Sequence, residues 1–211
     1  MINAMFEDHS FTEKSMPKGN RLHSHSSSIA ACRLFVLGVL ISFSGWVFEI
    51  VGRYLVYNDL SDRGFLTLPL CPIYGISVVS VYLLIGTPSN LHGIIGASIR
   101  KTKTWRKGVF YFLFVTLIST VAELVTGLGA KSAGITLWDY SERPLNLFGI
   151  ICLSYSLMWG VLITVFMSLL WKPLYSLISR IKINILFPLS LTLVITIIAD
   201  FTVSIIRTFS N

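Results

Sequence analysis

The stretch that decides the fold runs from residue 138 to residue 160 and reads WDYSERPLNLFGIICLSYSLMWG. Its first part, from Trp138 to Asn146, is polar and charged, whereas the part from Leu147 to Gly160 has no charged side chain. Apolar runs of about 20 residues are long enough to cross the hydrocarbon core of a bilayer. The abrupt change of polarity therefore places the edge of a membrane within this stretch.

The composition of the whole chain indicates an integral membrane protein. Of its 211 residues, 54% are hydrophobic and 13% are charged, and the mean hydropathy is +0.73, whereas about 25% charged residues is usual in soluble domains. The apolar runs are continuous rather than alternating, which excludes a transmembrane barrel. We therefore predict an all-α, polytopic transmembrane helical bundle, in which each helix satisfies its own backbone hydrogen bonds in lipid.

We predict about five spans, each near the length needed to cross the bilayer, and a single transmembrane domain from residue 29 to residue 211. The predicted spans are 31–56, 68–86, 109–128, 148–170 and 187–206. Residues 1–28 are polar and of mixed charge, so we expect a flexible cytoplasmic tail. His23 and His25 lie in this tail and are expected to be solvated, so we predict no metal site there.

The charge distribution predicts the orientation of the chain. Most Lys and Arg residues lie in the tail and in the 87–108 and 171–186 loops. The positive-inside rule therefore puts the N-terminus in the cytoplasm and the C-terminus outside, in a multi-pass protein of the cell membrane. Basic residues beside spans also explain the net charge of +7 through contact with anionic lipid. No basic groove with interleaved aromatic residues is present, so we expect no nucleic-acid partner.

Ionisable residues within the spans are the first candidates for function, because charges are costly there and usually face a cavity or a partner. Glu49 and Arg53 are four residues apart, on one helix face, and are expected to pair. Glu123 and Asp200 come late in the third and fifth spans, so three acids reach a similar depth near the outer side. Two alternatives stay open: the pair merely fixes helix packing, and Asp200 reaches water at the span end.

The second unusual stretch is RGFLTLPLCPIYG, residues 63–75. Its prolines and glycines at the start of a span predict a broken or re-entrant helix in an outer loop, or a simple kink. The amides freed at such a half-helix N-terminus suit an anionic group. Cys71 has no neighbouring histidine and is not expected to be a nucleophile. The cysteines Cys32, Cys71 and Cys152 lack CxxC spacing, so no zinc or redox motif is indicated.

These stretches together predict a polar pocket open to the outer face, with part of its aromatic rim also serving as interface anchors. The predicted substrate-binding residues are Glu49, Arg53, Arg63, Tyr74, Glu123, Trp138, Asp139, Tyr140 and Asn146. The chain has no GxxxxGK[ST], HExxH, GxSxG or GxGxxG motif. We therefore expect no cofactor, and any energy source has to come from a partner or a gradient.

Seven short blocks stand in order between residues 45 and 160: GWxxE, RGFL, PxCPIYG, ExxTG, WDYS, PLN and GxICLxxSxxWG. Together they resemble the Putative ABC-transporter type IV family of bacterial membrane proteins, the CmpB-like group. This resemblance implies a permease whose ATPase is a separate chain, and the small number of spans implies a homo-oligomer or another partner. Two positions differ from the family pattern: Asp62 stands where members often have Asn, and Lys131 stands where they often have an acid.

The leading hypothesis is a permease component of a transporter. One alternative is a membrane-embedded enzyme acting on a lipid or lipid-linked substrate at the outer leaflet. In that case Glu49 or Glu123 is the general base and Asp139 a second acid or a metal ligand, and Arg63 holds an anionic headgroup. A second alternative is a non-catalytic membrane partner protein. Because the chain has no ATPase or hydrolase motif, we favour the permease over the enzyme.

Overall fold

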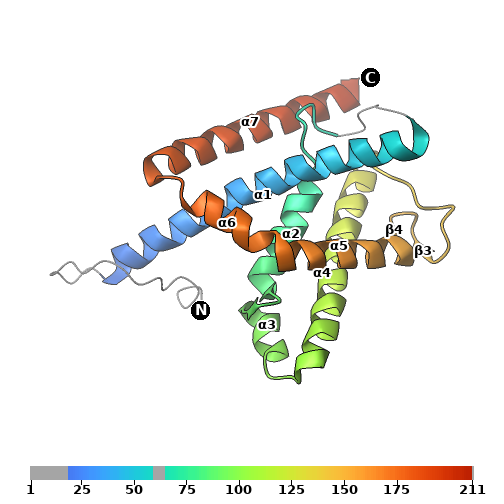
Figure 1. Cartoon of the computed structure of the whole chain (residues 1–211). Coiled ribbons are helices and arrows are strands. Elements are labelled where there is room, and N and C mark those ends of the chain that lie inside the picture. Colours follow the sequence, from blue (N-terminus) through green and yellow to red (C-terminus); the bar gives the residue numbers. More distant parts are fainter. Residues whose placement is uncertain (1–18, 59–64, 211) are drawn as a thin grey trace.

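The computed structural model describes residues 19–58 and 65–210, which form an all-α structure (Figure 1). The helices are α1 (Gly19–Tyr57), α2 (Pro72–Leu84), α3 (Gly93–Ile99), α4 (Thr104–Ser132), α5 (Leu153–Leu169), α6 (Trp171–Ser179) and α7 (Ile183–Ser210). The described residues also contain two short antiparallel strand pairs: β1 (Gly86–Thr87) with β2 (Asn90–Leu91), and β3 (Asn146–Leu147) with β4 (Ile151–Cys152). The predicted fold class is confirmed.

The helices fall on the predicted apolar runs but differ from them in length. Helices α1, α4 and α7 are each long and apolar enough to cross a membrane, and α5 with α6, bent by 52°, makes a fourth candidate if the pair counts as one span. Helix α2 has 13 residues, which at 1.5 Å per residue is about 20 Å. That length is shorter than the hydrocarbon core of about 30 Å. The second predicted span is therefore a shorter apolar helix.

Two segments predicted as tail or loop contain helix. Helix α1 begins at Gly19, within the predicted tail, and residues 1–18 lie outside the described residues. The predicted 171–186 loop contains α6, where Trp171, Leu174 and Ile178 recur at helical spacing. This face packs against α1 and α5, and Trp171 and Ile178 are buried. The apolar face of α6 explains why the segment is helical despite its basic residues.

Two helix pairs form the centre of the fold. Helix α1 packs along α2, and α4 packs along α5, while α2 also contacts α4. At Gly75 of α2, a Cβ atom would collide with the Gly38 carbonyl of α1. At Gly160 of α5, a Cβ atom would collide with the Thr116 hydroxyl of α4. Small residues therefore allow both helix pairs to approach closely, as is common between membrane helices.

The buried core lies between these pairs and extends to α6 and α7. Leu37, Val81, Val115 and Leu186 come from α1, α2, α4 and α7 and are fully buried in one apolar cluster. Helix α7 lies beside α1 (Figure 1), yet only 11% of its most apolar window is buried. The remaining apolar surface of α7 is typical of a helix that faces lipid.

Helix α2 begins beside the middle of α1. Residues 65–71 are not helical, and the Cys71 amide donates a 3.0 Å hydrogen bond to the Ser42 carbonyl. Ser42 lies near the centre of the apolar window Ser27–Leu55 of α1. Pro72 occupies the first helical position, where its missing N–H removes no helical hydrogen bond. The proline-rich stretch is therefore an irregular segment followed by a short helix.

Candidate functional site

Glu49 joins α1 to the beginning of α2. Its Oε1 atom accepts a 2.7 Å hydrogen bond from the Tyr74 hydroxyl and lies 3.6 Å from the Cys71 sulfur, which donates to it. Tyr74 packs closely against Gly45 of α1, and the Cys71 amide bonds to the Ser42 carbonyl of the same helix. Arg53 lies one turn further along α1 and is half-buried. The structure thus brings together two predicted site residues, Glu49 and Tyr74, from different helices.

Glu123 points into the protein from α4. The buried residues of α4 recur every four positions, at Tyr111, Val115, Ser119, Glu123 and Gly127, so they form one inward stripe. Glu123 is only 6% exposed, and its Oε1 atom accepts a 3.1 Å hydrogen bond from the Tyr140 hydroxyl. Its Oε2 atom is buried and has no hydrogen-bond partner among the described residues. Buried polar atoms without partners are rare, and each calls for an explanation.

Aromatic side chains connect the two glutamates. The Tyr140 ring stacks on Tyr155 of α5, with 4.8 Å between ring centroids and an interplanar angle of 11°. One turn further along α5, Trp159 meets the Tyr74 ring edge to face at 5.2 Å. Tyr74 and Tyr140 are close enough to interact electrostatically. We call the set formed by Glu49, Tyr74, Glu123, Tyr140, Tyr155 and Trp159 the glutamate–tyrosine cluster.

Tyr140 belongs to the loop that connects α4 to α5, and its hydroxyl is held in the neutral form. Burial raises the pKa of Tyr140 well above its ordinary value, and the nearby Glu123 carboxylate raises it further. A neutral phenol keeps its proton and so remains a hydrogen-bond donor. Tyr140 therefore donates to Glu123 throughout the physiological pH range.

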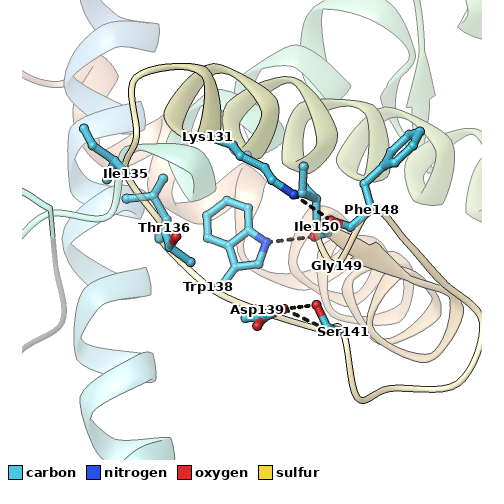
Figure 2. Close-up of a pocket in the computed structure, with 11 residues that line it drawn as sticks. Lys131, Ile135, Thr136, Trp138, Asp139, Ser141, Phe148, Gly149 and Ile150 are labelled. Atoms are coloured by element: carbon cyan, nitrogen blue, oxygen red, sulfur yellow. Dashed lines mark hydrogen bonds between the residues drawn. The ribbon is translucent and has the colours of Figure 1, made fainter.

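The same loop encloses a small cavity at the end of α4 (Figure 2). The Trp138 indole donates a 2.7 Å hydrogen bond to the Ile150 carbonyl, and the Lys131 ammonium donates a 3.4 Å bond to the Phe148 carbonyl. The cavity has a volume of about 140 Å³ and is lined by Gly127, Lys131, Ile135, Thr136, Leu137, Trp138, Asp139, Ser141, Phe148, Gly149 and Ile150. Gly127 lies one helical turn beyond Glu123, so the cavity adjoins the cluster.

Asp139 and Asn146 shape this loop through internal hydrogen bonds. Asp139 Oδ1 accepts bonds from the Ser141 amide at 2.8 Å and the Ser141 hydroxyl at 2.5 Å, and these bonds lower the pKa of Asp139 below its ordinary value. The Asn146 amide donates to the carbonyls of Ser141 and Arg143, and its Oδ1 accepts from the Gly149 amide. Gly149 has φ +71 and no room for a side chain beside Ser141. The loop is therefore held in one defined conformation.

Asp200 has a different set of neighbours. From α7 it accepts hydrogen bonds from the Thr67 hydroxyl and, at 3.1 Å, from the Leu68 amide. Nearby, the rings of Phe65 and Phe201 meet at 5.6 Å. Asp200 thus ties α7 to the irregular segment before α2. Arg63, which we predicted to bind substrate, lies outside the described residues.

Tyr155 and Trp159 were not among the site residues predicted from the sequence. Both are aromatic residues near the start of an apolar run, where interface anchoring is the usual interpretation. Their spacing of four residues places them on one face of α5, and this spacing is the feature of the sequence that could have indicated a shared site. That face meets the neighbours of both glutamates, Tyr74 and Tyr140.

The long apolar helices and the buried Glu123 among them define a polytopic α-helical membrane protein. Residues 36–205 match the family described as Putative ABC-transporter type IV (CmpB), and the chain belongs to this family. The match extends beyond the 45–160 range of the blocks that first indicated it. It identifies the chain as a transporter-related membrane protein. No solved structure matches the chain significantly.

Proposed function

We propose that the chain is the membrane-spanning permease component of a transporter, and that it binds its solute at the glutamate–tyrosine cluster. Membership of a transporter-type family supports this function. The observation that carries it is Glu123, a buried carboxylate with one oxygen atom unpartnered among the described residues. Ionisable residues inside membrane helices commonly mark substrate or ion pathways.

The proposed orientation puts the N-terminus in the cytoplasm and the α4–α5 loop outside, following the distribution of basic residues. In this orientation the 140 Å³ cavity is an outer vestibule, and Glu123 lies one turn deeper along α4. The short helix α2 begins beside the middle of α1 and next to Glu49. Transporter sites commonly form at such discontinuous helices, near the middle of the bilayer.

The proposed complex contains more than one chain. The described residues contain three candidate spans, or four with the bent pair counted as one span, which are few to enclose a solute path. The sequence has no nucleotide-binding P-loop, so the ATPase is assigned to a separate subunit. A second copy of this chain, or another membrane subunit, completes the wall of the path.

Purification of the tagged full chain from its native membrane in mild detergent tests this function. We expect an ATPase to copurify, and we expect ATP hydrolysis by the reconstituted complex to fall in Glu123→Gln. The matched control is Glu142→Gln, which changes an exposed carboxylate in the α4–α5 loop and is expected to leave hydrolysis unchanged.

Two other results would contradict the permease function and support a different one. Turnover of labelled lipid by the chain alone, abolished by Glu49→Gln, would assign a membrane-embedded enzyme. Unchanged function in cells after Glu49, Arg63 and Glu123 are substituted together would exclude both roles and leave a non-catalytic membrane partner.

A further inference from the structure

Two helix starts in this chain share the same local pattern. Helix α2 follows Cys71 at its N-cap position, and α5 follows Cys152 at its N-cap position. A tyrosine stands three residues after each cysteine, at Tyr74 and Tyr155, and a small residue stands at the fourth, Gly75 or Ser156. Both tyrosines belong to the glutamate–tyrosine cluster.

The helices that precede these two starts also correspond. Each carries one glutamate of the cluster, Glu49 in α1 and Glu123 in α4. Seven residues before each glutamate is a hydroxyl residue that donates to the carbonyl four residues earlier. Ser42 donates to the Gly38 carbonyl at 2.8 Å, and Thr116 donates to the Phe112 carbonyl at 2.9 Å.

The corresponding helices form corresponding hairpins. Helix α1 packs on α2 at Gly75, and α4 packs on α5 at Gly160. Helix α2 contacts α4, so the two hairpins are neighbours (Figure 1). They follow each other along the chain and share the same local pattern, so they correspond to repeats of one unit. In transporters built from repeats, the substrate site lies at the interface between the repeats.

The glutamates of the two hairpins differ in burial and in hydrogen bonding, and this difference indicates which of them binds a ligand. Glu49 is exposed and is bonded by Tyr74 of its own hairpin. Glu123 is buried and is bonded by Tyr140 of the connecting loop, while its Oε2 atom has no partner in the described part of the chain. No Lys or Arg of the described residues interacts with it electrostatically. A buried carboxylate without a counter-charge is costly, and either a proton or a cationic ligand would relieve that cost.

The walls around Glu123 are aromatic. Tyr140 and Tyr155 stack face to face beside it, and Trp159 and Tyr74 continue the aromatic surface toward Glu49. Aromatic faces attract cations and are especially suited to organic ammonium groups. The Arg143 guanidinium already lies over the Tyr155 ring, 5.9 Å from its centroid. The cluster therefore combines a buried anion with the rings that an organic cation prefers.

We infer that the interface between the α1–α2 and α4–α5 hairpins binds an organic ammonium ion, with Glu123 as its anionic anchor and the cluster tyrosines and Trp159 as its walls. This inference rests on the proposed function, because it names the class of solute for that site. It requires no ATPase, however, and is tested on the purified chain alone.

The experiment compares choline with its uncharged isostere 3,3-dimethylbutan-1-ol, by calorimetric binding to the full chain in detergent. We expect saturable binding of choline and none of the neutral alcohol. Glu123→Gln keeps a side chain that can accept from Tyr140, and we expect it to weaken choline binding by about tenfold or more, the size of a lost charged contact. Glu142→Gln is the matched control and binds choline as the unchanged protein does.

Equal binding of the neutral alcohol, or choline binding unaffected by Glu123→Gln, would overturn the inference. Competition by sodium as effective as that by choline would overturn its assignment to an organic ion. If Glu123→Gln does not fold, Tyr155→Leu removes one aromatic wall and leaves the carboxylate, and we expect weaker choline binding. If the chain copurifies with an ATPase but does not bind choline, the inferred ligand is wrong and the permease function is still supported. If the chain binds choline but no ATPase copurifies, the binding site is supported and the permease function is not.

Discussion

The Tyr140 hydroxyl lies 3.1 Å from Glu123 Oε1 and donates a hydrogen bond to it. This bond joins a residue of the α4–α5 loop to the inward stripe of a membrane helix. The same tyrosine ring is fixed from the other side by its stacking on Tyr155. Tyr140 therefore links Glu123 to the loop that forms the cavity wall.

Replacing Tyr140 with phenylalanine tests this link. The Tyr140→Phe variant keeps the stacked ring but leaves both Glu123 oxygens without a donor among residues 19–58 and 65–210. We expect a loss of about 1–3 kcal/mol in the free energy of unfolding, typical for a hydrogen bond to a buried carboxylate. Hydrogen exchange measured by mass spectrometry should rise across residues 137–150. Tyr155→Phe, which also keeps its ring, is the control, and equal protection in both variants would contradict the link.

The close contact between α1 and α2 predicts a specific glycine effect. Gly75→Ala places a methyl group against the Gly38 carbonyl, and such overpacking costs about 1–3 kcal/mol. Gly52→Ala, in α1, meets open space and should gain up to about 1 kcal/mol of helix stability. Thermal unfolding in detergent distinguishes them. A Gly75→Ala protein as stable as Gly52→Ala would show that the helices are further apart.

The bonds of Asp200 predict that α7 holds the segment before α2. Asp200→Ala removes the acceptor of both the Thr67 hydroxyl and the Leu68 amide. Residues 65–71 should then exchange their amide hydrogens faster, with a stability loss of about 1.5–3 kcal/mol. Thr67→Val removes only one of the two bonds and should have a smaller effect. Unchanged exchange in Asp200→Ala would mean that the segment is held by other contacts.

The loop should also lose stability in acid. The Ser141 hydrogen bonds lower the pKa of Asp139 in the folded protein, so its carboxylate contributes stability above its unfolded pKa. That contribution to stability is lost as the pH falls through the folded pKa, beginning at about pH 5. Thermal midpoints between neutral pH and pH 3.5 should therefore fall more in the unchanged protein than in Asp139→Asn. Glu142→Gln is the control, and parallel curves for all three proteins would contradict the assignment.

The sequence was sufficient to predict the membrane class and several members of the cluster. Glu49 and Glu123 stand out because they are charges within apolar runs, and Tyr140 lies within the polar stretch at a span edge. The bend after α5 was not predictable from the apolar run itself. Helix α6 has Lys172 beside its apolar face, and basic residues next to a span normally indicate a loop.

The relation between the two hairpins was also hidden in the sequence. The two helix starts share only Cys and Tyr at fixed positions, within CPIYG and CLSYS. The correspondence becomes visible once both cysteines are N-caps and both preceding helices carry a Ser or Thr bonded to the backbone. Long-range contacts such as Tyr74 with Trp159 depend on how the hairpins pack, which residue spacing alone does not determine.

We propose that Glu49 and Glu123, from different hairpins, act in one binding site. A double-mutant cycle on choline affinity, using Glu49→Gln, Glu123→Gln and the double variant, tests it most directly. Residues in one site show interaction energies of about 0.5–3 kcal/mol, whereas independent residues add. We predict a double variant that loses clearly less affinity than the sum of the two single losses. Additive losses, or a Glu123→Gln protein that binds choline normally, would contradict a shared site.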